Sequence, residues 1–156
     1  MTRLEWPRAI LHLDMDAFFV NVHILENPSD NGIPLAVGGK PGQMGVIASA
    51  SYEARAKGVR SAMASSKALK LCPELKFVSS NRPMIRSCSA KVMEILARYG
   101  TLEKMSVDEA FVDLSLQKNP EALVKTILKR IKLETNLPSS AGLATSKLVA
   151  KIASDF

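Results

Sequence analysis

The most constraining feature of this sequence is a pair of short acidic clusters, each placed where an apolar, strand-like run ends. The first cluster is Asp14 with Asp16, and the second is Asp108 with Glu109. Carboxylates that converge on strand ends from distant parts of a chain can hold hard divalent cations through oxygen ligands. The fold must therefore bring these two strand ends together. An acidic metal site in an otherwise basic chain points to phosphoryl transfer.

Each cluster also has a simpler interpretation. Asp14 and Asp16 would face the same side of a continuing strand, but a helix starting at Asp16 would make that residue an N-cap, and capping is the favoured role. Asp108 and Glu109 are adjacent, so only a turn lets both reach one ion, and such a pair is common on hairpin surfaces. With substrate phosphates completing the shells, three carboxylates suffice for two metal ions, which can stabilise an in-line displacement.

Composition narrows the class of protein. The chain has 156 residues, a length typical of one domain, with 47% hydrophobic residues and a net charge of +6 that favours polyanionic partners. Cys72 and Cys88 have no metal-ligand spacing and are interpreted as buried apolar residues in a reducing compartment. No apolar run is long enough to cross a bilayer, and we expect a cytoplasmic protein without a membrane partner.

The hydrophobic periodicity predicts an α+β fold. Strands are expected at residues 9–13, 34–37, 45–49, 76–79, 102–107, 110–114 and 139–144, and helices at 17–25, 51–57, 64–71, 85–99, 123–131 and from Ser146 onward. With the insert at about residues 26–81 and one helix set aside, this is the order of a ferredoxin-like, split βαβ fold. The insert would form a separate small lobe.

Other side chains allow both functional and structural interpretations. Tyr52 and Arg55 would be adjacent on a short helix, near Lys57 and Arg60, and suit a triphosphate, although a solvated basic face is the commoner outcome. Lys147 and Lys151 share one face of the last helix and have the same two interpretations. In Phe18-Phe19, one ring is expected in the core, while the other could exclude a 2′-hydroxyl. His12 and His23 are interpreted as structural.

Five motifs, in this order, resemble those of the Y-family translesion DNA polymerases of the DinB/UmuC type. They are Leu-Asp-Met-Asp-Ala-Phe-Phe (13–19), Ala-Ser-Tyr-Glu-Ala-Arg (50–55), Gly-Val-Arg-Ser-Ala-Met (58–63), Ser-Val-Asp-Glu-Ala-Phe (106–111), and Ser-Ala-Gly-Leu-Ala followed by Ala-Lys-Ile-Ala-Ser-Asp (140–155). The resemblance covers nearly the whole chain. Four positions depart from the family's usual residues: Val20, His23, Ala64 and Ile85. None of them is a metal ligand.

The resemblance implies a palm formed by residues 1–26 and 82–156 and a fingers lobe formed by 27–81. It implies that two Mg²⁺ ions, with Mn²⁺ as a substitute, are held by Asp14, Asp108, Glu109 and the Met15 carbonyl. It assigns the steric gate to Phe19, triphosphate contacts to Tyr52, Arg55 and Lys151, a position beside that site to Ser49, and positions near the templating base to Val46 and Ala48.

The implied function is two-metal nucleotidyl transfer from a deoxynucleoside triphosphate to a primer 3′-hydroxyl on a DNA template, in damage bypass. The implied partners are template-primer DNA, the nucleotide, and a sliding clamp bound through a C-terminal region. On this resemblance the chain ends before the thumb and little-finger domains, and a bacterial protein would be nucleoid-associated. A catalytically idle polymerase-derived accessory or binding subunit and a nucleotide cyclase on a related palm remain as alternatives.

Overall fold

The computed structural model describes residues 7–156, and these divide into two compact units. One unit consists of residues 7–16 together with 86–156, and the other is the continuous segment Ala17–Ile85. The predicted boundaries of a palm and a fingers lobe stay a prediction. Each unit has its own sheet, so each is described by itself.

The first unit has the predicted α+β architecture. Its sheet has the order β5-β6-β1-β7, and every neighbouring pair is antiparallel. Helix α4, whose residues 82–85 belong to the second unit, leads into β5, and helix α5 connects β6 to β7. The elements are β1 (Ile10–Met15), α4 (Arg82–Ala97), β5 (Thr101–Lys104), β6 (Glu109–Asp113), α5 (Pro120–Thr135), β7 (Ser139–Ala144) and α6 (Lys147–Ser154). This connectivity confirms the ferredoxin-like, split βαβ prediction.

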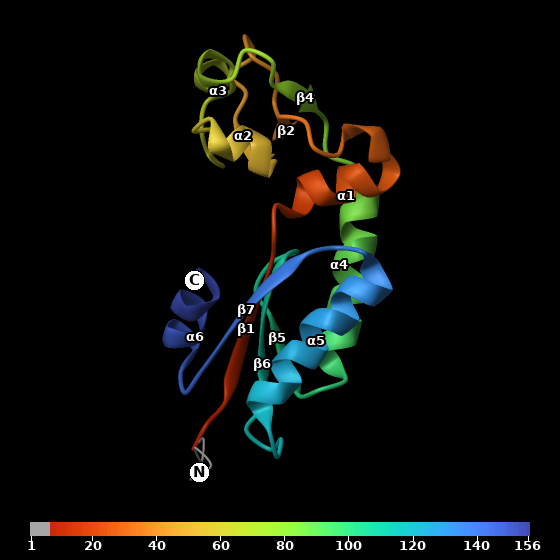
Figure 1. Cartoon of the computed structure of the whole chain (residues 1–156), viewed down its shortest axis with the longest axis vertical. Coiled ribbons are helices and arrows are strands. Elements are labelled where there is room, and N and C mark those ends of the chain that lie inside the picture. Colours follow the sequence, from red (N-terminus) through yellow and green to blue (C-terminus); the bar gives the residue numbers. More distant parts are fainter. Residues whose placement is uncertain (1–6) are drawn as a thin grey trace. The chain divides into compact units, whose positions relative to one another are not determined.

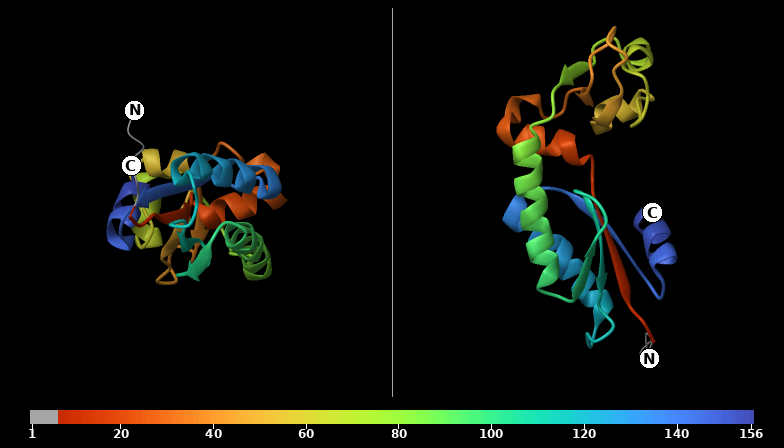
Figure 2. Two further views of the ribbon diagram at one scale, coloured as in Figure 1. Left: turned by 90° about the horizontal axis from the view of Figure 1, so that it is seen from below. Right: turned by 180° about the vertical axis from the view of Figure 1, so that it is seen from behind.

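Strand β1 divides its side chains between the two faces of this sheet. Ile10 packs with Phe111, Ala144 and Ala150 of α6, so Ile10, His12 and Asp14 lie on the face that α6 covers. Figure 1 and the view from behind in Figure 2 show α4 and α5 on the other side of the sheet. The three remaining side chains of the strand therefore face α4 and α5: Leu11, Leu13 and Met15, all buried.

Local sequence signals explain the ends of the later helices. Helix α5 begins at Pro120, three positions before Leu123, the first residue of the predicted helix. The reason is that Asn119 is an N-cap that accepts a hydrogen bond from Ala122 N at 3.2 Å. It ends at Asn136, whose φ of 56° is left-handed. Ser146 caps α6 through Val149 N at 3.3 Å, as the sequence predicts.

The predicted N-cap role of Asp16 is wrong. Helix α1 (Phe18–Glu26) has its N-cap at Ala17, which has φ 40° and ψ 51° and makes no side-chain capping bond. Asp16 instead accepts a hydrogen bond from Ser140 Oγ at 2.7 Å, and its backbone N–H donates to Pro138 O at 3.1 Å. Because Ala17 has a left-handed backbone, the helix begins one residue later than it would with Asp16 as its N-cap.

The second unit contains a smaller, three-stranded sheet in the order β3-β2-β4. Strand β2 pairs antiparallel with β3 and parallel with β4. Besides α1, the elements are η1 (Pro28–Asp30), β2 (Leu35–Gly38), β3 (Ile47–Ala50), α2 (Tyr52–Ala56), α3 (Ser65–Leu71) and β4 (Lys76–Val78). Its core is built largely from small side chains, including Ala36, Ala50, Ala54 and Ala68, which allow the short elements to pack closely.

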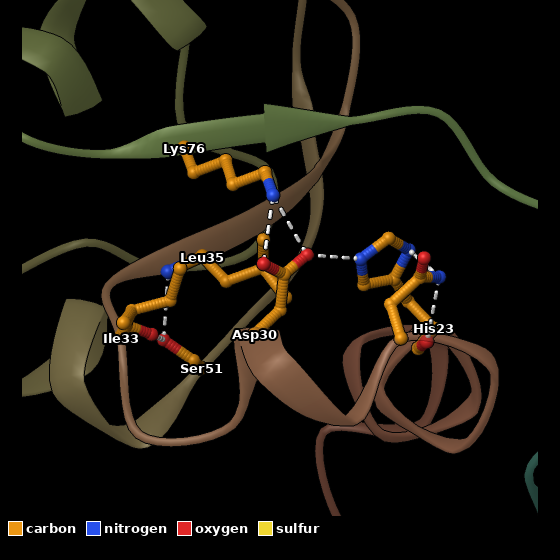
Figure 3. A network of polar contacts seen from close by, with 7 residues as sticks. His23, Asp30, Ile33, Leu35, Ser51 and Lys76 are labelled. Atoms are coloured by element: carbon orange, nitrogen blue, oxygen red, sulfur yellow. Dashed lines mark hydrogen bonds and ion pairs between the residues drawn. The ribbon is translucent and has the colours of Figure 1, made fainter.

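Two polar groups join the elements of the second unit (Figure 3). The buried carboxylate of Asp30 bonds to His23 Nε2 at 2.7 Å and to Lys76 Nζ at 2.7 and 2.8 Å, so it connects η1 to α1 and β4. Ser51 Oγ accepts from Leu35 N at 2.9 Å and donates to Ile33 O at 3.1 Å. His23 therefore has the structural role that the sequence predicts.

Over residues 7–156, none of the helices combines the length and the apolar character that crossing a membrane requires.

Candidate active site

The two acidic clusters meet at one end of the large sheet. Asp14 on β1 and Glu109 on β6 are partners in the antiparallel register, and Met15 N donates to Asp108 O at 2.9 Å. Directly opposed residues on one face have Cβ atoms roughly 4.5–5.5 Å apart. The strand ends thus converge as the sequence requires, with Asp14 and Glu109 as immediate neighbours.

Asp108 belongs to the turn between β5 and β6, while Glu109 is the first residue of β6. The predicted strand over 102–107 ends earlier, at Lys104, because Met105 N and Ser106 N both donate to Glu109 O at 3.0 and 3.1 Å. This turn frees Asp108 from the alternation that would point it away from Glu109. Ser106 Oγ then donates to Asp108 Oδ1 at 2.7 Å and orients that carboxylate.

The electrostatics of the two neighbouring carboxylates differ. Burial, together with the charges of Asp108 and Glu109, raises the pKa of Asp14 from 3.8 to about 6. The hydrogen bond from Lys151 and a second from His12 lower the pKa of Glu109 below its usual value, against the effect of burial. The site therefore concentrates negative charge, and Glu109 is the member with cationic and polar partners.

Lys151 lies on α6 and forms an ion pair with Glu109 Oε1. The same contact raises the pKa of Lys151 above its usual value. Its helix neighbour Lys147 pairs with Glu103 on β5 and lies 5.6 Å from the centre of the Phe111 ring. Of the two lysines that share this helix face, Lys151 is the one at the acidic cluster.

His12 is a residue whose contact with the site the sequence interpretation missed. Its ring is 1% exposed, and its Nε2 lies 2.8 Å from Glu109 Oε1. The signal was present in the alternation of β1, which puts His12 on the same face as Asp14. What the sequence did not reveal is the register that brings Glu109 within reach of the ring.

The donor set suits a hard divalent cation in its chemistry. The available donors are all oxygens, which Mg²⁺ prefers: the carboxylates of Asp14, Asp108 and Glu109 and the carbonyl of Met15. Burial and repulsion from Asp108 and Glu109 raise the pKa of Asp14, and a bound cation would relieve the repulsion. Within residues 7–156, no three His, Cys, Asp or Glu side chains already form a ligand cluster. A metal shell here is therefore completed by further oxygen ligands, from water or from a substrate phosphate.

In the second unit, the basic residues near Tyr52 have different partners. Arg55 donates from Nε to Ala50 O at 2.9 Å, which fixes the base of its guanidinium beside β3. Arg60 donates to Arg55 O and Val59 O at 2.6 and 2.9 Å, and Lys57 pairs with Glu74. Arg60 thus satisfies carbonyls at the end of α2, and Arg55 remains the better candidate for phosphate. Tyr52 is 56% exposed.

The aromatic pair is divided as the sequence predicts, since Phe18 is buried and Phe19 only partly so, packed against the cluster of Val20, Leu35 and Val37. The two rings are tilted, with centroids 5.9 Å apart.

On β3 and its approach, Val46 and Ala48 are exposed while Ser49 is buried.

The candidate residues therefore fall into two groups, one in each unit. The first unit carries Asp14, Met15, Asp108, Glu109 and Lys151, and the second carries Phe19, Val46, Ala48, Ser49, Tyr52 and Arg55. The carboxylates and Lys151 are in contact or in register, whereas the second group is spread over α1, β3 and α2.

Comparisons with known proteins agree with this architecture. The family model of the impB/mucB/samB family matches residues 13–155. The chain is 44% identical over 154 residues to a DNA polymerase IV of Clostridium perfringens and 47% identical to one of Bacteroides fragilis, covering 96% of this chain and 43% and 42% of those proteins. The chain thus spans less than half the length of these relatives.

Solved structures show the same fold. A crystal structure of DinB from Sulfolobus solfataricus matches with a TM-score of 0.87 and 31% identity, covering 94% of this chain and 45% of that one. An insertion ternary complex of Dbh DNA polymerase matches with a TM-score of 0.87 and 29% identity over the same shares of the two chains.

Proposed function

This chain belongs to the impB/mucB/samB family, and from that premise we propose that it is the catalytic palm and fingers portion of a DNA-directed translesion DNA polymerase. The reaction is attack of a primer 3′-hydroxyl on a deoxynucleoside triphosphate with release of pyrophosphate. Relatives named DNA polymerase IV and a ternary complex of Dbh polymerase support this reaction class. The observation that carries the proposal for this chain is the register that sets Asp14 opposite Glu109, with Asp108 in the adjoining turn.

We propose that two Mg²⁺ ions are held by four ligands: the carboxylates of Asp14, Asp108 and Glu109 and the carbonyl of Met15. When bound, such ions neutralise phosphate charge and stabilise the attacking and leaving oxygens of an in-line displacement. The chain's own part is to hold the oxygen donors in place. Ser106 restrains Asp108, and the β1–β6 register restrains Asp14 against Glu109.

The nucleotide-binding group is proposed on the resemblance of the motifs. Tyr52, Arg55 and Lys151 contact the triphosphate with Ser49 beside them, and Phe19 is the steric gate against a 2′-hydroxyl. Arg55 is anchored through Nε, which is compatible with a fork of N–H donors turned toward phosphate.

Val46 and Ala48 lie near the templating base, and their small, exposed side chains suit a roomy site.

The remaining proposals concern the domains and the partners. The palm comprises residues 1–26 and 82–156, and the fingers comprise 27–81. Template-primer DNA is the macromolecular partner, a sliding clamp binds a region beyond this chain, and a bacterial protein acts at the nucleoid in the cytoplasm. The net charge of +6 favours a polyanionic partner.

Calorimetric titration of the chain with a deoxynucleoside triphosphate tests the proposal. We expect binding that requires Mg²⁺ and that weakens at least about 10-fold in Asp108→Asn, since the metal ligands hold the nucleotide through the ion. Asp113→Asn is the matched control, because it removes one charge at the opposite end of β6. Binding that is absent, or that is indifferent to both Mg²⁺ and Asp108, would contradict the proposal and favour an idle accessory subunit.

A further inference from the structure

The buried ring of His12 is held from three sides. It lies opposite Phe111 on β6 and Gly142 on β7 in the two registers of β1. The Phe111 ring packs against it at a centroid distance of 4.8 Å. Its Nδ1 is 2.7 Å from Ser154 Oγ, near the end of α6, and its Nε2 is 2.8 Å from Glu109 Oε1.

Gly142 is the reason that α6 comes close enough for Ser154 to reach the ring. A Cβ at this position would lie 2.1 Å from Ala150 O and 2.5 Å from Ser154 N. Both are backbone atoms of α6, so a side chain at residue 142 would force the helix away from the sheet. The absence of that side chain directly beside His12 lets the helix backbone and Ser154 close over the ring.

The hydrogen-bond partners fix which nitrogen of His12 faces the carboxylate as a donor. The ionised Glu109 carboxylate, which Lys151 also contacts, can only accept. Ser154 Oγ lies 2.7 Å from both Lys151 O and His12 Nδ1 and has one proton for the two. If that proton goes to Nδ1, a neutral ring carries its own proton on Nε2. If it goes to the Lys151 carbonyl, Nδ1 donates to Ser154, and the ring then carries a proton on both nitrogens. Because an ionised carboxylate cannot donate, Nε2 at 2.8 Å from Glu109 Oε1 is a donor in both arrangements.

We propose that His12 is a positioning residue that, backed by Ser154, holds the Glu109 carboxylate in the orientation needed to bind metal. The metal in this inference rests on the proposed function. The contact between His12 and Glu109 rests on the geometry alone. Polar groups that orient a metal ligand in this way typically change metal affinity by about 10–100-fold when they are removed. Ser106 donates to Asp108 in the same way, so each of the two adjacent carboxylates, Asp108 and Glu109, has a side-chain donor.

Two variants separate the roles of the two nitrogens. In His12→Gln the side-chain amide nitrogen is as many bonds from Cβ as Nε2 is, so it can still donate to Glu109. In His12→Asn the amide reaches only the position of Nδ1, so it can bond to Ser154 but not to Glu109. Both are smaller than His, both leave a gap beside Phe111, and circular dichroism with thermal unfolding establishes that each is folded.

The test is the affinity of the 156-residue chain for Mn²⁺, measured by electron paramagnetic resonance. We expect His12→Asn to bind about 10–100-fold more weakly than the unaltered chain, and His12→Gln to restore most of the affinity. Equal affinities of His12→Asn and the unaltered chain would overturn the inference. Equal losses in both variants would also overturn it, because they would show that ring packing matters and the donor does not.

A second measurement needs no metal. Nitrogen NMR of the imidazole in the unaltered chain should show a proton on Nε2 of His12, and an unprotonated Nε2 would overturn the inference. If the unaltered chain binds no Mn²⁺, the proposed function fails, while the state of Nε2 still decides whether His12 donates to Glu109.

Discussion

Asp14 and Glu109 face each other across the β1–β6 ladder, yet their pKa values move in opposite directions. The pKa of Asp14 rises because it is buried among other carboxylates, and that of Glu109 falls because Lys151 and His12 donate to it. Within one small acidic site, Glu109 therefore has hydrogen-bond donors, whereas Asp14 is buried and repelled by the neighbouring carboxylates. This difference makes the site measurable through the pH dependence of stability.

We predict that Asp14→Asn stabilises the metal-free chain at pH 8. Folding raises the pKa of Asp14 from 3.8 to about 6, so the ionised carboxylate opposes folding at high pH. This cost disappears as the pH falls below about 6 toward 3.8 and the folded state takes up a proton. The gain should be about 1–2 kcal/mol after allowance for solvent screening, measured by denaturant unfolding at pH 8 and at pH 4.

Asp113→Asn is the control with the opposite sign. Bonds from the hydroxyl and backbone N–H of Ser115 lower the pKa of Asp113, so its ionised form favours folding above its usual pKa. Its replacement should destabilise the chain at pH 8, with the difference shrinking as the pH falls through the lowered pKa. If both variants changed stability in the same direction, the account of the acidic site would be wrong.

We predict that Gly142→Ala destabilises the chain by about 1–3 kcal/mol, since the added methyl collides with the backbone of α6. It should also weaken Mn²⁺ binding, because α6 carries Ser154, which backs the His12 ring. Gly42→Ala serves as the control: its Cβ meets nothing within 4 Å, and only its φ of 84° opposes a side chain. A Gly142→Ala variant as stable as the unaltered chain would show that α6 is not held closely at this point.

In a longer protein that contains this chain and extends primers, Phe19→Ala should raise ribonucleotide incorporation by about 10-fold or more. A steric gate works by contact with the 2′-hydroxyl, and removing the ring opens that space. Phe18→Leu is the control, because Phe18 is buried and its replacement tests packing alone. Unchanged sugar selectivity in Phe19→Ala, measured by competition between ribonucleotides and deoxyribonucleotides, would show that Phe19 is only a packing residue.

The sequence was sufficient for the order of the elements and the meeting of the acidic clusters. Strand β7 has the predicted bounds, and the capping signals at Ser146 and Asn136 mark real helix ends. These features depend on local periodicity and on backbone groups that nearby side chains satisfy. The prediction for Asp16 failed for a different reason, since the left-handed backbone at Ala17 moves the helix start and Ser140, 124 residues away, takes the carboxylate.

Contacts that depend on register were also out of reach. His12 could be placed on the face of Asp14 by alternation, but its contacts with Glu109 and Ser154 span 97 and 142 residues. They exist because β6 pairs at one register and because Gly142 admits α6. A pattern of residue types determines neither the register of β6 nor how closely α6 approaches the sheet.

The central claim is that Asp14, Asp108 and Glu109 carry nucleotidyl transfer, and primer extension by a longer protein containing this chain tests it most directly. Asp108→Asn should reduce the rate of extension by roughly 100-fold or more, because it removes a charged group that stabilises the transition state. Asp113→Asn, on the same strand, should leave the rate close to that of the unaltered protein. Undiminished extension by Asp108→Asn would contradict the account.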